Sequence, residues 1–274
     1  MKFKRIYLEL SNYCNLNCLF CTPKNKNTRM ISKELAFKAI EEASSLTNEM
    51  CFHVLGEPLV YPYFFEVLDY LNEHGLDLML STNSRLIEKN KEQLLKRRIK
   101  TWNLSLHSTY DLKNKKEFIL NLLSFIEQYQ KEYESVFHLR LWAESNNTIK
   151  KSNDEIKEIL FDYYDYKGEQ SKRIRLKERI ILSYEEEFIW PSLDNDYEKE
   201  GYCLGGKNHI AILADGSVTM CCLDSNADTL LGNIKNNTLS EIITMSPYLD
   251  ARKSFNDNKC YFKLCKHCSY KDRR

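Results

Sequence analysis

Residues 14–21 read CNLNCLFC, which sets three cysteines in a CxxxCxxC pattern just after an apolar, strand-like segment, Phe3–Leu10. Three thiolates on one short loop can bind three irons of a 4Fe-4S cluster and leave the fourth iron open to an outside ligand. The alternative is a zinc site, which usually has a fourth Cys or His ligand. Cys14, Cys18 and Cys21 therefore predict an open metal site near the amino terminus.

The segments around this motif alternate between strand-like and helix-like patterns. A helix is expected after Ser32, a residue type that caps helices, and is followed by repeated strand-helix pairs. Strands are expected at Phe3–Leu10, Met50–Leu55, Asp77–Ser81, Thr101–His107, Phe137–Trp142 and Arg173–Leu182, with helices between them at about 63–73, 88–97, 115–129 and 154–164. About six βα units predict an α/β fold with a parallel sheet, open or curled into part of a barrel, since a closed barrel needs eight.

The pattern changes after about Trp190. His209–Cys221 alternates around an Asp215-Gly216 turn, which indicates a hairpin, and a short helix is expected at Thr238–Thr244. We therefore expect two domains, a large one over residues 1–190 and a small one over residues 191–274. Since chemistry in βα repeats collects at the carboxyl ends of strands, the position of the first cysteine group favours iron-sulfur over zinc.

Composition narrows the class of protein. The chain has 274 residues, 40 Lys and Arg against 39 Asp and Glu, and a net charge of +1. No run approaches the roughly 18 apolar residues of a membrane span, and the amino terminus is too charged for a signal peptide. We expect a globular cytoplasmic protein that binds neither membrane nor bulk nucleic acid. Its ten cysteines then indicate metal ligation rather than disulfides.

A second cysteine group lies near the carboxyl end. Cys203 and Cys221 flank the expected hairpin, and Cys265 and Cys268 form a CxxC pair. Four cysteines are enough to bind a complete iron-sulfur cluster or a zinc ion, and spacing does not separate the two. Cys222 and Cys260 are spare and either could replace an assigned ligand, whereas Cys51, on an expected strand, is interpreted as a buried free thiol.

With its CxxxCxxC loop after the first strand of six βα units, the chain resembles the radical S-adenosylmethionine (radical SAM) superfamily. The resemblance implies a partial (βα)6 TIM-like barrel in which S-adenosylmethionine chelates the open iron and is cleaved by one electron. The resulting 5'-deoxyadenosyl radical takes a hydrogen from the substrate. It also implies an external one-electron donor such as flavodoxin or ferredoxin. Phe20, just before the third cysteine, would contact adenine, and its alternative role is simple packing.

Further cofactor contacts are implied by the same resemblance. Leu55-Gly56-Glu57-Pro58 is similar to the GGEP stretch that contacts the methionine amine, although Leu55 replaces its first glycine. Strand-end residues would contact the ribose and the carboxylate; these are Ser81, Thr82, Asn83 and Ser105. The alternative for Gly56, Glu57 and Pro58 is ordinary turn chemistry, and for the strand-end residues it is helix capping.

The second cysteine group is similar to the Twitch domain, a short form of the SPASM domain that carries one auxiliary 4Fe-4S cluster. The resemblance assigns Cys203, Cys221, Cys265 and Cys268 to that cluster, so the chain would hold two 4Fe-4S clusters. Zinc at this second site stays the alternative.

The substrate is expected to be a small molecule held near the strand ends. Candidate contacts are Glu9, His53, His107, Arg140, Trp142 and Glu144, each of which could equally be a core or rim residue. The compact size, cysteine set and Lys/Asn-rich composition resemble queuine lyases, which implies C–N cleavage of queuine to preQ1. Alternatives are oxidation of a small alcohol, modification of a ribosomal peptide, and a non-catalytic zinc or iron-sulfur scaffold.

Overall fold

The computed structural model describes residues 2–21, 28–186 and 189–272. It is a mixed α/β structure whose residues fall into two compact units. Unit 1 comprises Met1–Asn15, Thr22–Leu78 and Ile189–Arg274, and unit 2 comprises Leu16–Cys21 and Met79–Phe188. Among the described residues, no helix is both long and apolar enough to cross a membrane.

Unit 1 is built on a sheet in which the first strand pairs with a strand from the carboxyl end of the chain. β1 is parallel to both of its neighbours, and the hairpin β8–β9 and strand β10 extend the sheet antiparallel beyond it. The strands in spatial order are β10 (Leu230–Asn233), β9 (Ser217–Thr219), β8 (His209–Ile212), β1 (Arg5–Leu8) and β2 (Glu49–Phe52). The expected hairpin at Asp215-Gly216 is confirmed, and Gly216 has a φ of +89°, which favours glycine.

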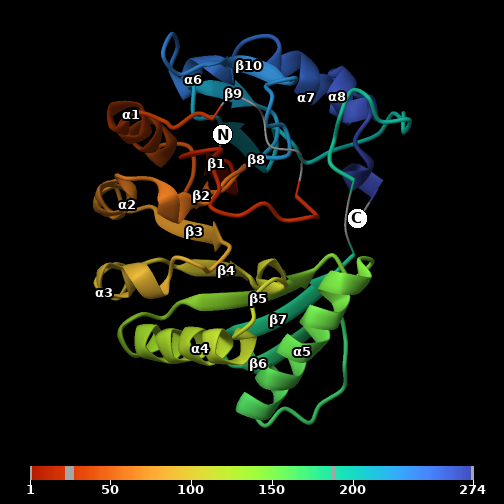
Figure 1. The fold of residues 1–274 in the computed structure, drawn as a ribbon. Helices are drawn as coiled ribbons and strands as arrows, with labels where there is room; N and C mark the ends of the chain where they lie inside the picture. Colours follow the sequence, from red (N-terminus) through yellow and green to blue (C-terminus); the bar gives the residue numbers. More distant parts are fainter. Residues whose placement is uncertain (1, 22–27, 187–188, 273–274) are drawn as a thin grey trace. The chain divides into compact units, whose positions relative to one another are not determined.

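Two helices lie next to each other beside β1 and β2 (Figure 1). α1 (Lys33–Ser44) begins as predicted at Ser32, whose side chain accepts a hydrogen bond from the backbone N–H of Leu35. α2 (Phe64–Glu73) packs on α1 through a stacked Phe37–Tyr70 pair with ring centroids 4.1 Å apart. A 3-10 turn, η1 (Pro58–Val60), precedes α2.

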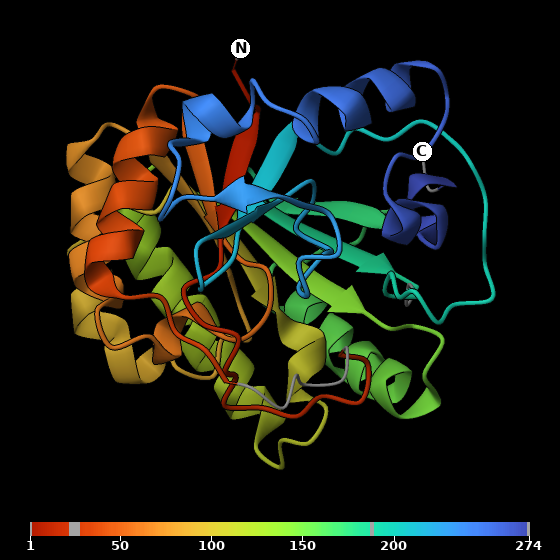
Figure 2. The same cartoon turned by 90° about the horizontal axis from the view of Figure 1, so that it is seen from above.

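The carboxyl-terminal part of unit 1 contains short helices (Figure 2). α6 (Leu239–Ile242) begins with a capping box between Thr238 and Glu241, within the helix expected at Thr238–Thr244. The sequence interpretation missed α7 (Tyr248–Asn256), α8 (Lys263–Lys266) and η4 (Ser269–Asp272). The buried Tyr248 hydroxyl donates to the carbonyl of Gly206 at 2.7 Å, which ties α7 to the segment before β8.

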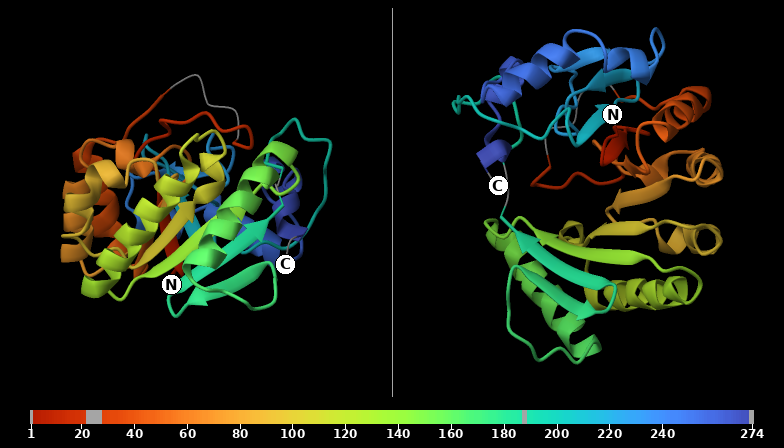
Figure 3. Two further views of the ribbon diagram at one scale, coloured as in Figure 1. Left: turned by 60° about the horizontal axis from the view of Figure 1, so that its bottom comes forward. Right: turned by 180° about the vertical axis from the view of Figure 1, so that it is seen from behind.

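Unit 2 is a parallel sheet with one antiparallel edge strand. Its spatial order is β3 (Asp77–Thr82), β4 (Thr101–Ser105), β5 (Val136–Trp142), β7 (Ile180–Glu185) and β6 (Arg173–Lys177). The helices α4 (Lys115–Glu132) and α5 (Asn147–Tyr163) cover one face of this sheet (Figure 3). Shorter turns follow β3 and β4, namely η2 (Glu88–Asn90), α3 (Lys91–Leu94) and η3 (Leu106–Thr109).

Several expected elements of unit 2 differ in the structure. The helix expected at about 154–164 begins earlier, at Asn147, and the strand expected at Thr101–His107 ends at Ser105, so that His107 lies in η3. The single strand expected at Arg173–Leu182 is a hairpin, because Glu178 and Arg179 form a turn that reverses the chain between β6 and β7. The helix expected at 88–97 is a 3-10 turn followed by a single α-helical turn. β7 pairs parallel to β5 and so takes the place of the sixth parallel strand that was expected.

Candidate functional site

The first cysteine group lies on the loop that leaves β1. All three cysteines are free thiols; Cys14 and Cys18 are half-buried and Cys21 is exposed. The backbone N–H of Cys21 donates to the carbonyl of Cys18 at 3.2 Å, so the CxxC half of the motif forms a turn. Cys14 belongs to unit 1, and Cys18 and Cys21 belong to unit 2. Free thiols are the residue type that binds iron-sulfur clusters, and the role of these three as ligands stays a prediction.

The Gly56-Glu57-Pro58 segment lies directly against the residues that precede Cys14. Gly56 has a φ of +76°, and a Cβ there would collide with the carbonyl oxygen of Ser11 and lie 2.6 Å from that of Tyr13. The N–H of Glu57 donates to the Tyr13 carbonyl at 2.9 Å. The buried Glu57 side chain accepts from the N–H of Leu59, which caps η1. This segment therefore supports the backbone of the cysteine loop, and position 56 needs glycine.

The polar residues at the end of β3 bond to nearby protein groups. Ser81 Oγ accepts from the amide of Asn103 at 3.2 Å. Thr82 Oγ1 and Asn83 Oδ1 accept from backbone N–H groups two residues further on, which is turn chemistry and not the helix capping that was the alternative for these positions. Their placement at the carboxyl end of a parallel strand is as expected, and their role as cofactor contacts stays a prediction.

Five of the expected residues form one cluster in unit 2. Arg140 Nη2 donates to Ser105 Oγ at 3.0 Å, and its guanidinium carbon lies 4.5 Å from the centre of the Trp142 ring. The His107 ring stacks on Trp142 at 6.0 Å and meets the edge of Phe20 at 4.6 Å. The guanidinium is thereby held in one orientation between a hydroxyl and an aromatic face.

His107 is neutral in this cluster. Burial lowers the pKa of its imidazole to about 3. Its Nδ1 lies 3.0 Å from the carbonyl oxygen of Arg140, and because a carbonyl only accepts, we assign the proton to Nδ1. Nε2 is then an acceptor. Glu144 is not joined to this cluster by the contacts described, since its oxygens lie at 2.6 Å from the Asn153 amide and 3.8 Å from Lys150 Nζ on α5.

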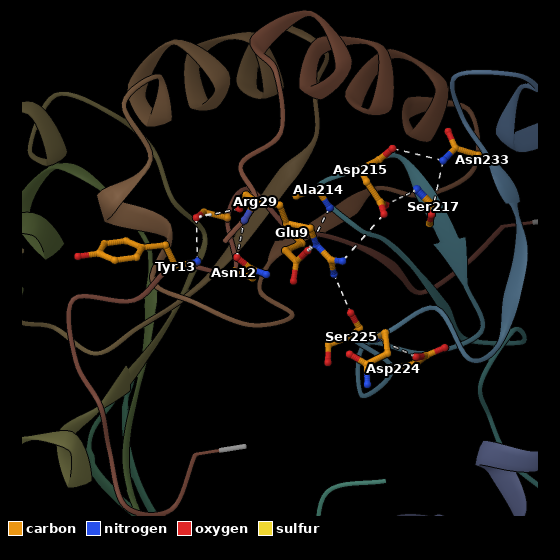
Figure 4. A network of polar contacts seen from close by, with 12 residues as sticks. Glu9, Asn12, Tyr13, Arg29, Ala214, Asp215, Ser217, Asp224, Ser225 and Asn233 are labelled. Atoms are coloured by element: carbon orange, nitrogen blue, oxygen red, sulfur yellow. Dashed lines mark hydrogen bonds and ion pairs between the residues drawn. The ribbon is translucent and has the colours of Figure 1, made fainter. Parts of the chain in front are cut away.

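Glu9, directly after β1, is the centre of a polar network in unit 1 (Figure 4). Its Oε2 accepts from Arg29 Nε at 2.9 Å and from the N–H of Ala214 at 3.1 Å. Arg29 also donates to the carbonyl of Ser225 at 2.7 Å and lies 3.9 Å from an Asp215 oxygen. Glu9 is 1% exposed, and its Oε1 has no hydrogen-bond partner among the residues the structure describes. Burial raises the pKa of Glu9, and Arg29 opposes that shift.

Arg29 is a site residue that sequence reasoning missed. It follows the cysteine loop with no spacing signal, and its hydrogen-bond partner Ser225, in the segment between β9 and β10, is 196 residues away. His53, one of the expected substrate contacts, has its ring centroid 6.3 Å from that of Tyr7.

The four assigned auxiliary cysteines line one pocket in unit 1. Cys203, Cys221, Cys265 and Cys268 meet there with six other residues: Pro191, Leu223, Asp224, Thr229, Leu264 and Lys271. Backbone N–H groups of Gly205 and Leu223 lie 3.4 Å from the sulfurs of Cys203 and Cys221. Burial and the neighbouring cysteines raise the pKa of Cys265, and burial raises the pKa of Cys268 to about 11.

The two spare cysteines lie outside this pocket lining. Cys222 packs on a small apolar cluster of Val54, Ala211 and Leu213, and the Cys260 sulfur lies 3.5 Å from the carbonyl of Gly201. Cys51 is buried, as expected, and burial raises its pKa. The structure therefore favours Cys221 over its neighbour Cys222 as a ligand.

This donor set fits a 4Fe-4S cluster. Each thiolate of such a cluster binds its own iron, so the four sulfurs need not meet at one point, and N–H donors to the sulfurs are usual. Within the described ranges, no three or more His, Cys, Asp or Glu side chains are arranged to hold a single metal ion.

Comparisons with known proteins agree with this geometry. Residues 8–136 match the model of the Radical SAM superfamily, and residues 203–269 match that of SPASM, an iron-sulfur cluster-binding domain. A segment of 99 residues is 32% identical to an uncharacterized protein of Methanocaldococcus jannaschii, covering 34% of this chain and 35% of that protein. A segment of 114 residues is 27% identical to GTP 3',8-cyclase of Clostridium botulinum, covering 39% and 36%. The matches thus span about a third of each relative.

Among solved structures, BtrN in complex with AdoMet and 2-DOIA superposes with a TM-score of 0.63 at 18% identity, covering 98% of this chain and 94% of BtrN. At this identity the likeness shows the fold. The two matched domains imply S-adenosylmethionine and more than one 4Fe-4S cluster as cofactors. The chain therefore contains a radical SAM domain over residues 8–136 and a SPASM-type iron-sulfur cluster-binding domain over residues 203–269.

Proposed function

We propose that this radical SAM enzyme holds one cluster through Cys14, Cys18 and Cys21 and an auxiliary cluster through Cys203, Cys221, Cys265 and Cys268, and that it acts on a small molecule. The observation that carries the proposal is the meeting of the last four cysteines, from separate segments of the chain, in one pocket beside two N–H donors. When bound, S-adenosylmethionine and the first cluster supply a radical that abstracts a hydrogen from the substrate.

The residues of unit 2 support binding and orientation. Phe20 offers an aromatic edge directly before Cys21, and His107 holds a neutral acceptor nitrogen behind it. Arg140, fixed by Ser105 and Trp142, is suited to a carboxylate, which planar guanidinium groups bind through two parallel hydrogen bonds. We assign the cofactor carboxylate or a substrate oxyanion to this group.

For the substrate, queuine is the first candidate and the reaction is C–N cleavage to preQ1. Support comes from Glu9, whose buried Oε1 is an acceptor without a protein donor among the described residues. A carboxylate oxygen in this state is suited to the adjacent N–H groups of a deazaguanine edge. Because the other oxygen is fixed by Arg29 and Ala214, the acceptor would be rigid.

A small alcohol is the second candidate, with oxidation in place of cleavage. What supports it is a likeness in fold to BtrN, whose structure is in complex with AdoMet and 2-DOIA. An external one-electron donor such as flavodoxin or ferredoxin is required in either case.

The test is an anaerobic assay of the reconstituted protein with S-adenosylmethionine and reductant, in which 5'-deoxyadenosine and preQ1 are followed by mass spectrometry with and without queuine. Both products should rise together only with queuine. If 5'-deoxyadenosine forms but queuine has no effect, queuine is refuted and alcohols are tested next. The matched control replaces Cys14, Cys18 and Cys21 with Ala. Formation of 5'-deoxyadenosine by that variant would refute the radical SAM site itself.

Metal analysis tests the scaffold alternative. Two 4Fe-4S clusters require about eight irons per chain, one requires about four, and stoichiometric zinc would favour a non-catalytic scaffold.

A further inference from the structure

Lys271 is a buried cation beside the auxiliary cysteines. It exposes 7% of its surface and lines the same pocket as the four sulfurs. Its ammonium donates to three backbone carbonyls of the CxxC segment, those of Cys268 at 2.7 Å, Cys265 at 3.1 Å and Lys266 at 3.4 Å. It also lies 4.8 Å from the centre of the Tyr197 ring.

The contacts of Lys271 give its charge no counter-charge among the residues that the structure describes. All three hydrogen bonds go to neutral carbonyls, and no carboxylate among the described residues forms an ion pair with it. The acidic residue of the pocket is Asp224, whose two oxygens accept four hydrogen bonds from Asn226, Asp228 and Thr229. Asp224 is thus engaged with its own loop. A buried lysine is rarely left without an anionic partner, so its position needs an explanation.

We infer that Lys271 is a positioning residue for the auxiliary cluster, which fixes the CxxC segment and raises the reduction potential of the cluster it holds. The inference rests on the proposed auxiliary cluster. Four thiolates give such a cluster a net negative charge, and reduction adds another. A cation nearby stabilises the reduced form more than the oxidised form, and burial limits screening of that effect by salt.

Fixing the CxxC segment and raising the reduction potential are two effects that can be measured separately. The three carbonyl bonds hold the CxxC segment, so their loss lowers iron retention. The charge acts on the potential, which a purely structural role would not move. Lys271→Gln keeps a hydrogen-bond donor without charge, Lys271→Met removes both, and Lys271→Arg keeps the charge. Lys263, the exposed first residue of α8, gives a matched control as Lys263→Met.

The experiment uses the full chain with Cys14, Cys18 and Cys21 replaced by Ala, so that only the auxiliary cluster remains. Iron content and an EPR-monitored redox titration are measured for each variant. We expect a more negative midpoint potential in Lys271→Gln and Lys271→Met, and a potential near the parent value in Lys271→Arg and Lys263→Met. If both neutral variants lose iron and Lys271→Arg keeps it, the charge is needed for assembly, which also supports the inference.

Two results would overturn it. One is an unchanged potential in a neutral variant that retains its iron. The other is loss of the cluster from all three Lys271 variants, which would show a structural role alone. Zinc in place of iron in the parent chain would instead refute the auxiliary cluster, and the inference with it, and the metal content of the parent separates that case.

Discussion

Replacing Arg29 with Met should destabilise the protein strongly, because Arg29 compensates a buried carboxylate. Glu9 is almost fully buried, and Arg29 Nε lies 2.9 Å from its Oε2. Met has a similar unbranched stem, so the variant removes the charge and its hydrogen bonds with little loss of packing. Glu9 would keep a single described donor, the N–H of Ala214.

The expected loss in the free energy of unfolding of Arg29→Met follows from the burial of the ion pair. Removing one partner of a buried ion pair costs about 3–5 kcal/mol. The Arg29 side chain is 25% exposed, so water screens part of the interaction. We therefore expect a loss of about 2–3 kcal/mol, near or below the lower end of that range. For a chain of this size, that corresponds to a fall of roughly 5–10 °C in the unfolding midpoint.

The pH dependence gives a second readout. Burial already raises the pKa of Glu9, and the loss of Arg29 would raise it further. A carboxyl whose folded-state pKa lies above its unfolded value costs stability at high pH, and protonation relieves that cost as the pH falls through the folded pKa. The stability deficit of Arg29→Met should thus shrink as the pH is lowered through the raised folded-state pKa of Glu9.

The assay is anaerobic thermal unfolding at one scan rate, with wild type and variant side by side at each pH. Lys33→Met is the control, since the Lys33–Glu66 ion pair is exposed and should leave the midpoint unchanged within error. An Arg29→Met midpoint equal to that of wild type, or a deficit that widens as the pH falls, would refute the role given to Arg29.

Three further substitutions test other parts of the structure. Gly56→Ala should lower the midpoint and the retained iron, because its Cβ would meet the backbone carbonyl of Tyr13; retained iron at a wild-type midpoint would contradict this. Tyr129→Phe removes the hydroxyl that accepts from the N–H of Ile99 at 2.6 Å, so urea unfolding should show a loss of about 1–3 kcal/mol, and no loss would argue against the bond. Cys221→Ala should lose about four irons and Cys222→Ala none, as measured by iron analysis, and the reverse would exchange their assignment.

The sequence was most informative where a pattern is local. The CxxxCxxC loop, the Asp215-Gly216 hairpin and the Ser32 cap each lie within a few residues, so spacing alone indicated them. The parallel strands were also found, because each carries buried apolar residues, which in β1 and β5 alternate with less buried ones. The hairpin with its turn at Glu178-Arg179 was missed. Charged and apolar residues already alternate before it, so two more charged residues did not indicate a turn.

The part of the candidate site that the sequence could not predict depends on contacts between residues far apart in the chain. Arg29 and Lys271 carry charge in places where sequence indicates a surface residue, and their burial depends on segments brought in by the fold. Glu144 was expected near Arg140 on the strand, but its contacts run to α5, because a helix packed on the strand end supplies Asn153 and Lys150. Such pairings arise from packing, which residue spacing does not contain.

The pairing of β1 with β8 has a consequence for biosynthesis. The residues joined across this part of the sheet are 205 positions apart at Glu9 and Ala214, so one edge of β1 has no partner until most of the chain has left the ribosome. An unpaired strand edge is open to association with other chains, and contacts of such high sequence separation form slowly. Nascent and prematurely ended chains are therefore the species of this protein most exposed to aggregation, and the last quarter of the polypeptide protects the first strand.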